Sequence, residues 1–337
     1  MFFHRPDPGA RQPRWKRWLR FGAGFLLAAF IALNGMAYMH ARAMTHFVSG
    51  GEKTPEPESL TLLQKLKVLG MGVRVPRPVN RQTPSDFGLT YETVTLTNAR
   101  HIQLEAWLIR RPASRGMVLL FHGYTACKDS LLPAAVEFHQ MGYDTLLVDF
   151  YGSGGSQGNE TSVGVHEADD VLAACQWARR HSPDQPVILY GVSMGAAAIL
   201  RAVHVDHIDP DAIILECPFD RLLSTVQNRF RAMHLPAFPS ARLLVFWGGV
   251  QQGYNGFGFN PAEYAREVHC PVLLLHGEKD PRVTLPQMNR LAKNLNSASR
   301  YHVFAGLGHQ SYVSAQPEVW HNCVTDFLAS VARLQTK

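Results

Sequence analysis

The chain has 337 residues, of which 46% are hydrophobic and 18% charged. This length and apolar content suit one large α/β domain with smaller additions, and they exclude a disordered chain. The net charge of +6 does not indicate a nucleic-acid-binding protein, because residues 1–20 alone carry +5 and the rest of the chain is nearly neutral.

The N-terminal segment has the pattern of a membrane anchor. Phe21–Met39 is a run of 19 residues without a charged side chain, and a helix of that length reaches nearly across the hydrocarbon core. Six basic residues precede the run, and only Arg42 and Lys53 follow it closely. The positive-inside rule therefore predicts a cytoplasmic N-terminus and a domain outside the inner membrane. The alternatives are a signal peptide, cleaved near Ala41-Arg42-Ala43, and a buried soluble helix.

From residue 90 onward, strand-like and helix-like patterns alternate. Residues 91–97 and 102–110 alternate apolar and polar side chains, which predicts an antiparallel hairpin. Short apolar runs typical of buried parallel strands follow at 116–121, 145–148, 186–190, 212–215, 271–275 and 301–304. Helical patterns lie at 131–141, 165–181, 194–203, 287–295 and 318–334. This alternation predicts a doubly wound, mostly parallel α/β sheet.

One interval interrupts the alternation. Residues 218–268 separate two predicted strands by about fifty positions, which is too long for a simple loop. Helical patterns at 222–233 and 241–246 precede an aromatic, glycine-rich tract at 246–259. We expect a helical cap over the mouth of the sheet; the alternative is an insertion that does not contact substrate.

These patterns divide the chain into five parts. We expect a basic cytoplasmic tail (1–20), a transmembrane anchor (21–39), a stalk and lead-in (40–89), an α/β core (90–217 and 269–337) and the cap insertion (218–268).

The pentapeptide Gly191-Val192-Ser193-Met194-Gly195 is a G-x-S-x-G motif. It follows a predicted strand directly and opens a predicted helix, which is the setting of a nucleophile elbow. Gly191 and Gly195 remove the Cβ atoms that would meet neighbouring backbone in so sharp a turn. The pattern therefore predicts Ser193 as a nucleophile; a solvated serine in an ordinary turn is the alternative.

A serine hydroxyl needs a base, and the base needs an orienting acid. On a scaffold with this elbow the acid and then the histidine follow the serine in the chain. Asp280 comes just after the predicted strand 271–275, and His309 follows the last strand between glycines. We predict these two as acid and base, with Asp220 and Glu278 as alternative acids.

An oxyanion hole would complete the site. The backbone N–H of Met194, directly after the nucleophile, is one expected donor, and that of Tyr124, after the strand 116–121, is the other. His122 beside it could instead act in catalysis or bind a metal, although no partner at ligand spacing lies near it. The five cysteines, Cys127, Cys175, Cys217, Cys270 and Cys323, form no C-x-x-C pair, which favours buried free thiols, with one or two disulfides as the alternative for an exported domain.

These motifs together resemble the α/β-hydrolase superfamily, and within it the membrane-tethered Bem46-like and serine aminopeptidase-like members of lipase and esterase type. The likeness covers roughly residues 90–335 and rests on FHGYTA, DFYGSGGSQG at 149–158, GVSMG, HGEKDPRV and GLGH. Tyr151 stands where arginine is usual in the second motif, a departure that affects the subfamily and not the triad.

The resemblance implies an esterase, lipase or thioesterase that works through an acyl-enzyme and needs no metal or organic cofactor. We expect a small-molecule or lipid acyl substrate and attachment to the membrane, and no nucleic-acid partner. An aminopeptidase is the first alternative, but it would need an acidic pocket, for which the cap region offers Glu263 and Glu267 beside Asp220. A hydrolase fold that only binds is the second.

Overall fold

The computed structural model describes residues 14–55, 59–296 and 298–335. Residues 1–13 of the predicted basic tail, 1–20, therefore lie outside the described residues. Within the described residues, eight strands form one sheet in the order β1-β2-β4-β3-β5-β6-β7-β8. The strands are β1 (Glu92–Thr97), β2 (Gln103–Ile109), β3 (Met117–Phe121), β4 (Asp144–Val148), β5 (Val187–Val192), β6 (Ala212–Glu216), β7 (Val272–Gly277) and β8 (Arg300–Phe304).

The sheet confirms the predicted fold class. The first two strands form the expected antiparallel hairpin, with Glu92 opposite Leu108, and β2 pairs antiparallel with β4. All other neighbours are parallel. Every residue of β3, β4, β6 and β7 is buried, which explains why these strands are continuous apolar runs in the sequence.

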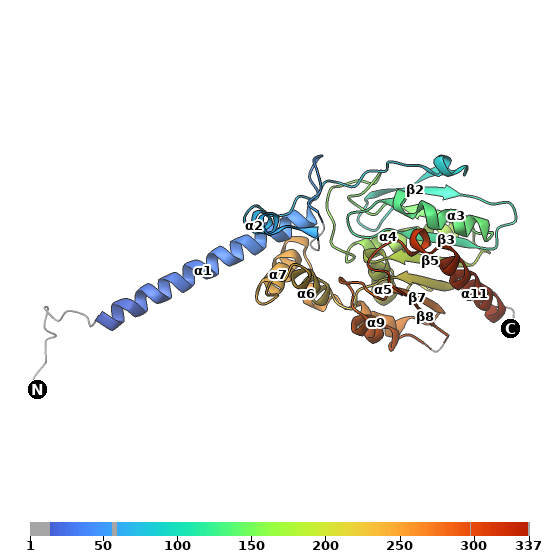
Figure 1. Ribbon diagram of the computed structural model, residues 1–337. Coiled ribbons are helices and arrows are strands. Elements are labelled where there is room, and N and C mark those ends of the chain that lie inside the picture. The colour runs from blue at the N-terminus through green and yellow to red at the C-terminus, as the bar shows by residue number, and fades with distance from the viewer. Residues whose placement is uncertain (1–13, 56–58, 297, 336–337) are drawn as a thin grey trace, which may run out of the picture.

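Helices cover both faces of the sheet, as Figure 1 shows. The helices of the α/β core are α3 (Leu132–Gln140), α4 (Glu167–His181), α5 (Met194–Asp206), α9 (Leu285–Ala292), α10 (Tyr312–Ala315) and α11 (Pro317–Gln335), with 3-10 turns η2 (Pro84–Phe87) and η3 (Lys128–Leu131). One apolar cluster joins α4 and α5 to the sheet, and a second joins α3 and α11 to the other face. The short helix α10 was not predicted, because one turn carries no periodicity.

The interval 218–268 is helical. It contains α6 (Leu222–Ala232), α7 (Ser240–Gln252), α8 (Pro261–Tyr264) and the 3-10 turns η4 (Gly256–Gly258) and η5 (Ala265–Glu267). The second helix is longer than the predicted 241–246, since it continues through Gly248 and Gly249. Glycine disfavours a helix interior, but packing against neighbouring helices outweighs that preference here. A Cβ on Gly249 would lie 2.4 Å from the Tyr254 carbonyl oxygen, so the returning chain needs a glycine at this position.

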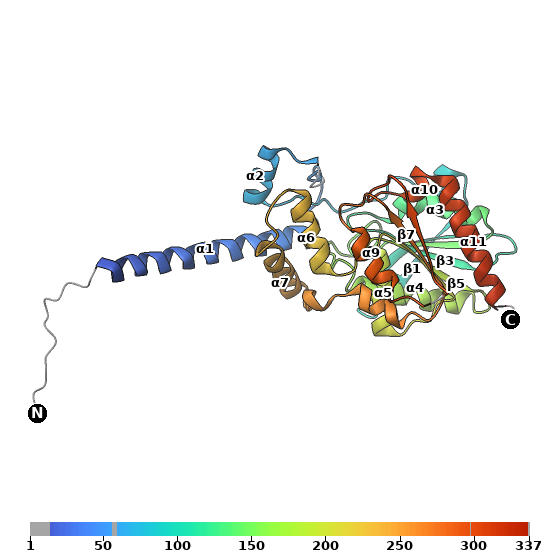
Figure 2. The same ribbon diagram turned by 60° about the horizontal axis from the view of Figure 1, so that its bottom comes forward.

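The N-terminal helix α1 (Arg14–Thr45) extends away from the sheet in both views, with its C-terminal end beside α6, α7 and α2 (Leu62–Met71) (Figures 1 and 2). It contains the predicted span 21–39 and exceeds it at both ends. Among the described residues it is the one helix long and apolar enough to cross a membrane. All five cysteines are free thiols; Cys127 and Cys217 are buried as expected, whereas Cys175, Cys270 and Cys323 are partly exposed.

The segment predicted as a stalk lies against the α/β core. His46 forms an isolated β-bridge to Glu160 of the core, and Val48 forms one to Pro76 within the lead-in itself. The Arg77 guanidinium donates to the carbonyl oxygens of three residues in the glycine-rich loop 152–158. This part of the lead-in is therefore bonded to the loop that follows β4.

A buried ion pair lies at the start of that loop, where β4 ends. Lys128 and Asp149 are both fully buried and paired, and Lys128 Nζ also lies 2.7 Å from Glu105 Oε1. Burial alone raises the pKa of Asp149, but the Lys128 ammonium outweighs it and holds the pKa below its ordinary value. Asn80 donates to the same carboxylate, which adds a link to the lead-in.

We expect Lys128→Met to destabilise the fold by about 3–5 kcal/mol, because it leaves the Asp149 carboxylate buried without its cation. Chemical denaturation of the full chain in detergent measures the change. Arg179→Met, which breaks the partly exposed pair with Asp211, is the matched control and should change stability by less than about 1 kcal/mol. Equal effects of the two substitutions would contradict the assignment of Lys128 as a structural cation.

Candidate active site

Ser193 occupies a strained turn between β5 and α5. Its φ of 52° and ψ of −106° lie outside the regions that residues with a Cβ prefer. A Cβ on Gly191 would lie 2.7 Å from the Ala196 backbone nitrogen, and one on Gly195 would lie 2.4 Å from the Phe121 carbonyl oxygen. Both glycines of the motif are therefore required by close backbone approach, as the sequence predicts.

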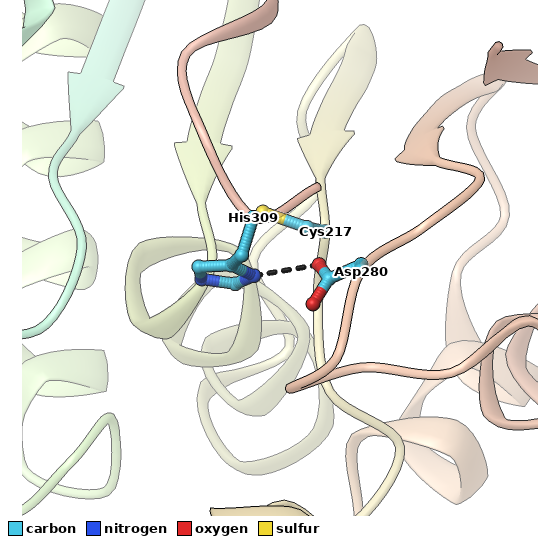
Figure 3. A group of neighbouring side chains, drawn as sticks. All are labelled: Cys217, Asp280 and His309. Atoms are coloured by element: carbon cyan, nitrogen blue, oxygen red, sulfur yellow. Dashed lines mark hydrogen bonds and ion pairs between the residues drawn. The ribbon is translucent and has the colours of Figure 1, made fainter. Parts of the chain in front are cut away.

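The structure brings the three predicted side chains together. His309 Nε2 lies 3.1 Å from Ser193 Oγ, and His309 Nδ1 lies 2.6 Å from Asp280 Oδ2. Figure 3 shows the second of these contacts, with the imidazole edge facing the carboxylate. The three groups form one line of hydrogen bonds, although they are 29 and 116 positions apart in the chain.

Two loops at the ends of β7 and β8 make this alignment. A Cβ on Gly277 would lie 2.4 Å from the Gly308 carbonyl oxygen, so the loops approach each other closely. The Lys279 N–H donates to the Leu307 carbonyl oxygen at 2.7 Å and joins them directly. The carboxylate and the imidazole are therefore held by bonded backbone.

The surroundings of Asp280 favour its ionised form. Its Oδ1 accepts backbone N–H groups from Arg282 at 2.8 Å and Val283 at 3.0 Å, which leaves Oδ2 for His309. Burial alone raises its pKa, but the hydrogen bond and charge of His309 outweigh the burial and lower the pKa below its ordinary value. A fixed anion beside Nδ1 selects the tautomer in which Nε2 can accept a proton.

The alternative acids have other partners. Asp220 Oδ2 accepts from Arg290 Nη2 at 2.6 Å, and its Oδ1 accepts from the Ser224 hydroxyl. Glu278 Oε2 accepts the Gly306 N–H at 2.8 Å. Of the three candidate acids, Asp280 is the one that contacts His309.

His122 has a structural environment. It is fully buried, its Nε2 accepts the Phe150 N–H at 3.1 Å, and its Nδ1 lies 2.9 Å from the Gly123 carbonyl oxygen. This pattern assigns the proton to Nδ1 and uses both ring nitrogens. Burial lowers the pKa of His122, which keeps the ring neutral.

Cys217 is a neighbour of the site that sequence reasoning did not select. It follows β6, the strand beside the one that carries Ser193, and only this adjacency of strands could have pointed to it. Its Sγ, one carboxylate oxygen of Asp280 and one ring nitrogen of His309 all lie within 4.8 Å of one another. Figure 3 shows the three side chains together. Burial raises the pKa of the Cys217 thiol well above its ordinary value. Since metals bind the thiolate, this group suits packing better than metal binding.

The loop after β3 lies beside the nucleophile. A Cβ on Gly123 would be 3.7 Å from Ser193 Cβ, so the loop that carries Tyr124 passes directly over the serine. Met194 is the first residue of α5, where backbone N–H groups have no acceptor within the helix. The two N–H groups predicted as oxyanion donors therefore belong to segments that flank Ser193.

A cavity of about 440 Å³ opens onto Ser193 and His309. This volume lies in the range of small-molecule sites. Val226, Arg229 and Phe230 of α6, Met233 directly after it and Leu244 of α7 line it, so the insertion forms part of its wall. The C-terminal half of α1 and the lead-in supply further wall residues.

The charged groups of the cavity lining are mostly basic. Among its described residues these are Lys53, Lys65, Arg74, Arg229 and Arg282, and the one carboxyl is that of Glu216. Burial raises the pKa of Glu216 to about 7, and its Oε1 accepts a hydrogen bond from Trp320. The lining therefore favours a substrate with neutral or anionic groups over a cationic substrate.

Comparisons with known proteins agree with the fold. Residues 112–247 match the family model described as serine aminopeptidase, S33. An uncharacterised protein of Mycobacterium tuberculosis is 30% identical over 220 residues, covering 64% of this chain and 71% of that protein. Lysophosphatidylserine lipase ABHD12 of Macaca fascicularis is 24% identical over 283 residues, a match that covers 73% of this chain and 69% of the lipase. The structure of the Pyrococcus furiosus esterase Pf2001 superposes with a TM-score of 0.62 at 24% identity. The superposition covers 76% of this chain and 98% of the esterase.

We expect Gly195→Ala to destabilise the elbow by about 1–3 kcal/mol, because the added methyl group meets the backbone of β3. Gly248→Ala is the matched control, since a Cβ there has no neighbour within 4 Å and the residue is in a helix. The control should leave stability unchanged or raise it. Thermal unfolding of both variants tests the close approach; a stability of Gly195→Ala equal to that of Gly248→Ala would contradict it.

Proposed function

The chain belongs to the α/β-hydrolase superfamily, and on that premise we propose that it is a serine hydrolase that cleaves an ester or thioester of an acyl substrate. The observation that carries the proposal is the hydrogen-bonded line from Asp280 through His309 to Ser193, at the floor of a cavity. The esterase and the lipase among the similar proteins agree with this class of reaction.

In the proposed mechanism, Ser193 Oγ attacks the acyl carbonyl carbon while His309 Nε2 takes the hydroxyl proton. Asp280 holds the imidazole in the required tautomer and stabilises the imidazolium. The tetrahedral intermediate collapses as His309 returns the proton to the leaving alcohol or thiol, which leaves an acyl-serine. Water, activated by His309, then releases the acid and restores Ser193.

The negative charge of the intermediate needs donors in place before reaction. We assign this role to the backbone N–H groups of Tyr124 and Met194. Their support is positional: the loop of Tyr124 passes over Ser193, and Met194 begins α5. Because both donors are backbone groups, the fold itself sets their place.

The cavity wall favours an acyl chain as the substrate group. Most of its lining is apolar, and it continues from the core to α1. We propose that the exposed apolar part of α1 spans the inner membrane once, with the N-terminus in the cytoplasm and the α/β domain outside. The charge asymmetry around 21–39 supports this orientation.

An aminopeptidase, the activity that the family model's description suggests, fits the cavity less well. Such an enzyme must bind a substrate ammonium, whereas the described lining is basic. The acidic residues considered for that role are paired elsewhere: Asp220 with Arg290, Glu263 with Arg266 and Glu267 with His204. A fold used only for binding is also less well supported, since such a protein needs no aligned acid, base and nucleophile.

We expect Ser193→Ala to abolish hydrolysis of p-nitrophenyl butyrate by the full chain in detergent micelles, a loss of roughly 10⁴-fold or more. Release of p-nitrophenol measures the rate, and labelling by a fluorophosphonate reports the reactive serine independently. Hydrolysis that survives in Ser193→Ala would place the nucleophile elsewhere. Silence of the native chain in both assays would favour the binding-only alternative.

We expect Asp280→Asn to lower kcat by roughly 10³–10⁴-fold, because the amide no longer fixes the imidazole tautomer. Asp220→Asn removes the partner of Arg290 and should lower stability while leaving kcat near that of the native chain. The pair of variants, assayed on the same ester, separates the two acids. A large loss of kcat in Asp220→Asn with none in Asp280→Asn would reverse the assignment.

The amine preference can be tested with two anilides that differ only in an amino group. We expect alanine p-nitroanilide to be hydrolysed no faster than propionyl p-nitroanilide, because the basic lining disfavours the ammonium. The ratio of the two kcat/KM values is the measurement. A strong preference for the alanine derivative would support the aminopeptidase instead.

A further inference from the structure

The C-terminal half of α1 presents one face to the cavity that holds Ser193. Its lining residues are Leu33, Met36, Ala37, His40 and Met44. They recur every three or four positions, which places them on one side of the helix. The helix that resembles an anchor in sequence is thus also a wall of the candidate active site.

A second face of the same half is bonded to the insertion. Asn34 Oδ1 accepts from Trp247 Nε1 at 3.1 Å, and the Tyr38 ring meets the Trp247 ring edge-on with centroids 5.5 Å apart. Gln251 donates to the Tyr38 carbonyl oxygen at 2.9 Å. These contacts to α7 fix the rotation of α1 about its axis, so the same five residues stay turned toward the cavity.

The end of α1 also reaches the loop beside the nucleophile. The Tyr124 hydroxyl donates to the Met44 carbonyl oxygen at 2.6 Å. Tyr124 is the residue whose backbone N–H we assign to the oxyanion hole. The cavity wall made by α1 therefore extends from Leu33 to the immediate surroundings of Ser193.

The other half of α1 has no protein around it. Residues 14–32 are exposed on every side, and the uncharged run predicted to span the membrane, 21–39, begins in this half and continues past Leu33. Burial begins at Leu33, where the helix meets the cavity. The predicted span therefore overlaps the beginning of the cavity face of α1.

Exposed apolar side chains surround this point. They are Leu62, Leu63 and Met71 of α2, Phe238 before α7, and Phe246 and Val250 on α7. Both ribbon views place α2, α6 and α7 around the inner end of α1 (Figures 1 and 2). A group of exposed apolar residues continuous with a membrane-spanning helix suits contact with lipid.

We propose that α1 guides the acyl chain of a membrane-resident ester from the bilayer to Ser193, along the face formed by Leu33, Met36, Ala37, His40 and Met44. The occupant of this path is a single acyl chain of a lipid, drawn from the leaflet without passing through water. The inference rests on the proposed function, and it adds a source and an entry path for the substrate.

The test compares two matched substitutions on one helix. Leu33→Trp narrows the path at its membrane end, and Leu27→Trp makes the same change on the fully exposed half, away from the cavity. Met36→Trp is a second path variant. Each full-length protein is placed in phospholipid nanodiscs and assayed on p-nitrophenyl butyrate and p-nitrophenyl dodecanoate.

We expect both path variants to lower kcat/KM for the dodecanoate by about tenfold, a change of about 1.4 kcal/mol, because the indole ring fills the path that the chain follows. Butyrate hydrolysis should fall much less than dodecanoate hydrolysis, so that the ratio of the two kcat/KM values drops, and the remaining butyrate hydrolysis shows that the variants are folded. Leu27→Trp should leave both rates at the native level.

Identical chain-length profiles for Leu33→Trp, Met36→Trp and Leu27→Trp, with butyrate hydrolysis intact and sensitive to Ser193→Ala, would overturn this inference alone. If neither the native chain nor any of the three variants hydrolyses butyrate, the proposed function is overturned, and the inference with it. A loss confined to butyrate in the path variants would also contradict the path, since it would place Leu33 at the reacting end.

Discussion

The turn from β5 into α5 holds Ser193 at a φ of 52°, a backbone conformation that side chains with a Cβ adopt only under constraint. The Ser193 N–H donates to the Glu216 carbonyl oxygen at 2.7 Å, which ties the turn to the neighbouring strand β6. The two flanking glycines give backbone the room to approach. Because parallel strands end at the same edge, this turn faces the loops that deliver Asp280 and His309, and the site is assembled there.

Much of this arrangement could be predicted from the sequence because it is encoded locally. Strands buried on both faces are continuous apolar runs, and the elbow needs small residues at fixed offsets from its serine. Asp280 and His309 follow from chain order on a parallel sheet. The choice of Asp280 over Asp220 was less secure, since both follow a strand. In the structure the Arg290 guanidinium donates a hydrogen bond to the Asp220 carboxylate, and sequence alone does not show that contact.

The features that could not be predicted depend on contacts between distant segments. The extension of α7 through Gly248 and Gly249 depends on packing with α1 and on the return of the chain at Tyr254. Cys217 lies beside His309 only because β6 adjoins β5. The cavity face of α1 is hidden in its sequence, because a helix suited to lipid is apolar all round and shows no stripe toward a protein.

The bonding of α1 to α7 has a consequence for kinetics. In the proposed arrangement the cavity opens beside a membrane-spanning helix, so the enzyme would encounter its substrate in two dimensions. Its rate then follows the mole fraction of the ester in the surface, so that added inert phospholipid slows turnover and added buffer does not. Because contacts with Trp247 hold the domain against α1, the mouth of the cavity in the proposed arrangement faces the leaflet on the side of the domain, and esters in the opposite leaflet would first have to cross the membrane.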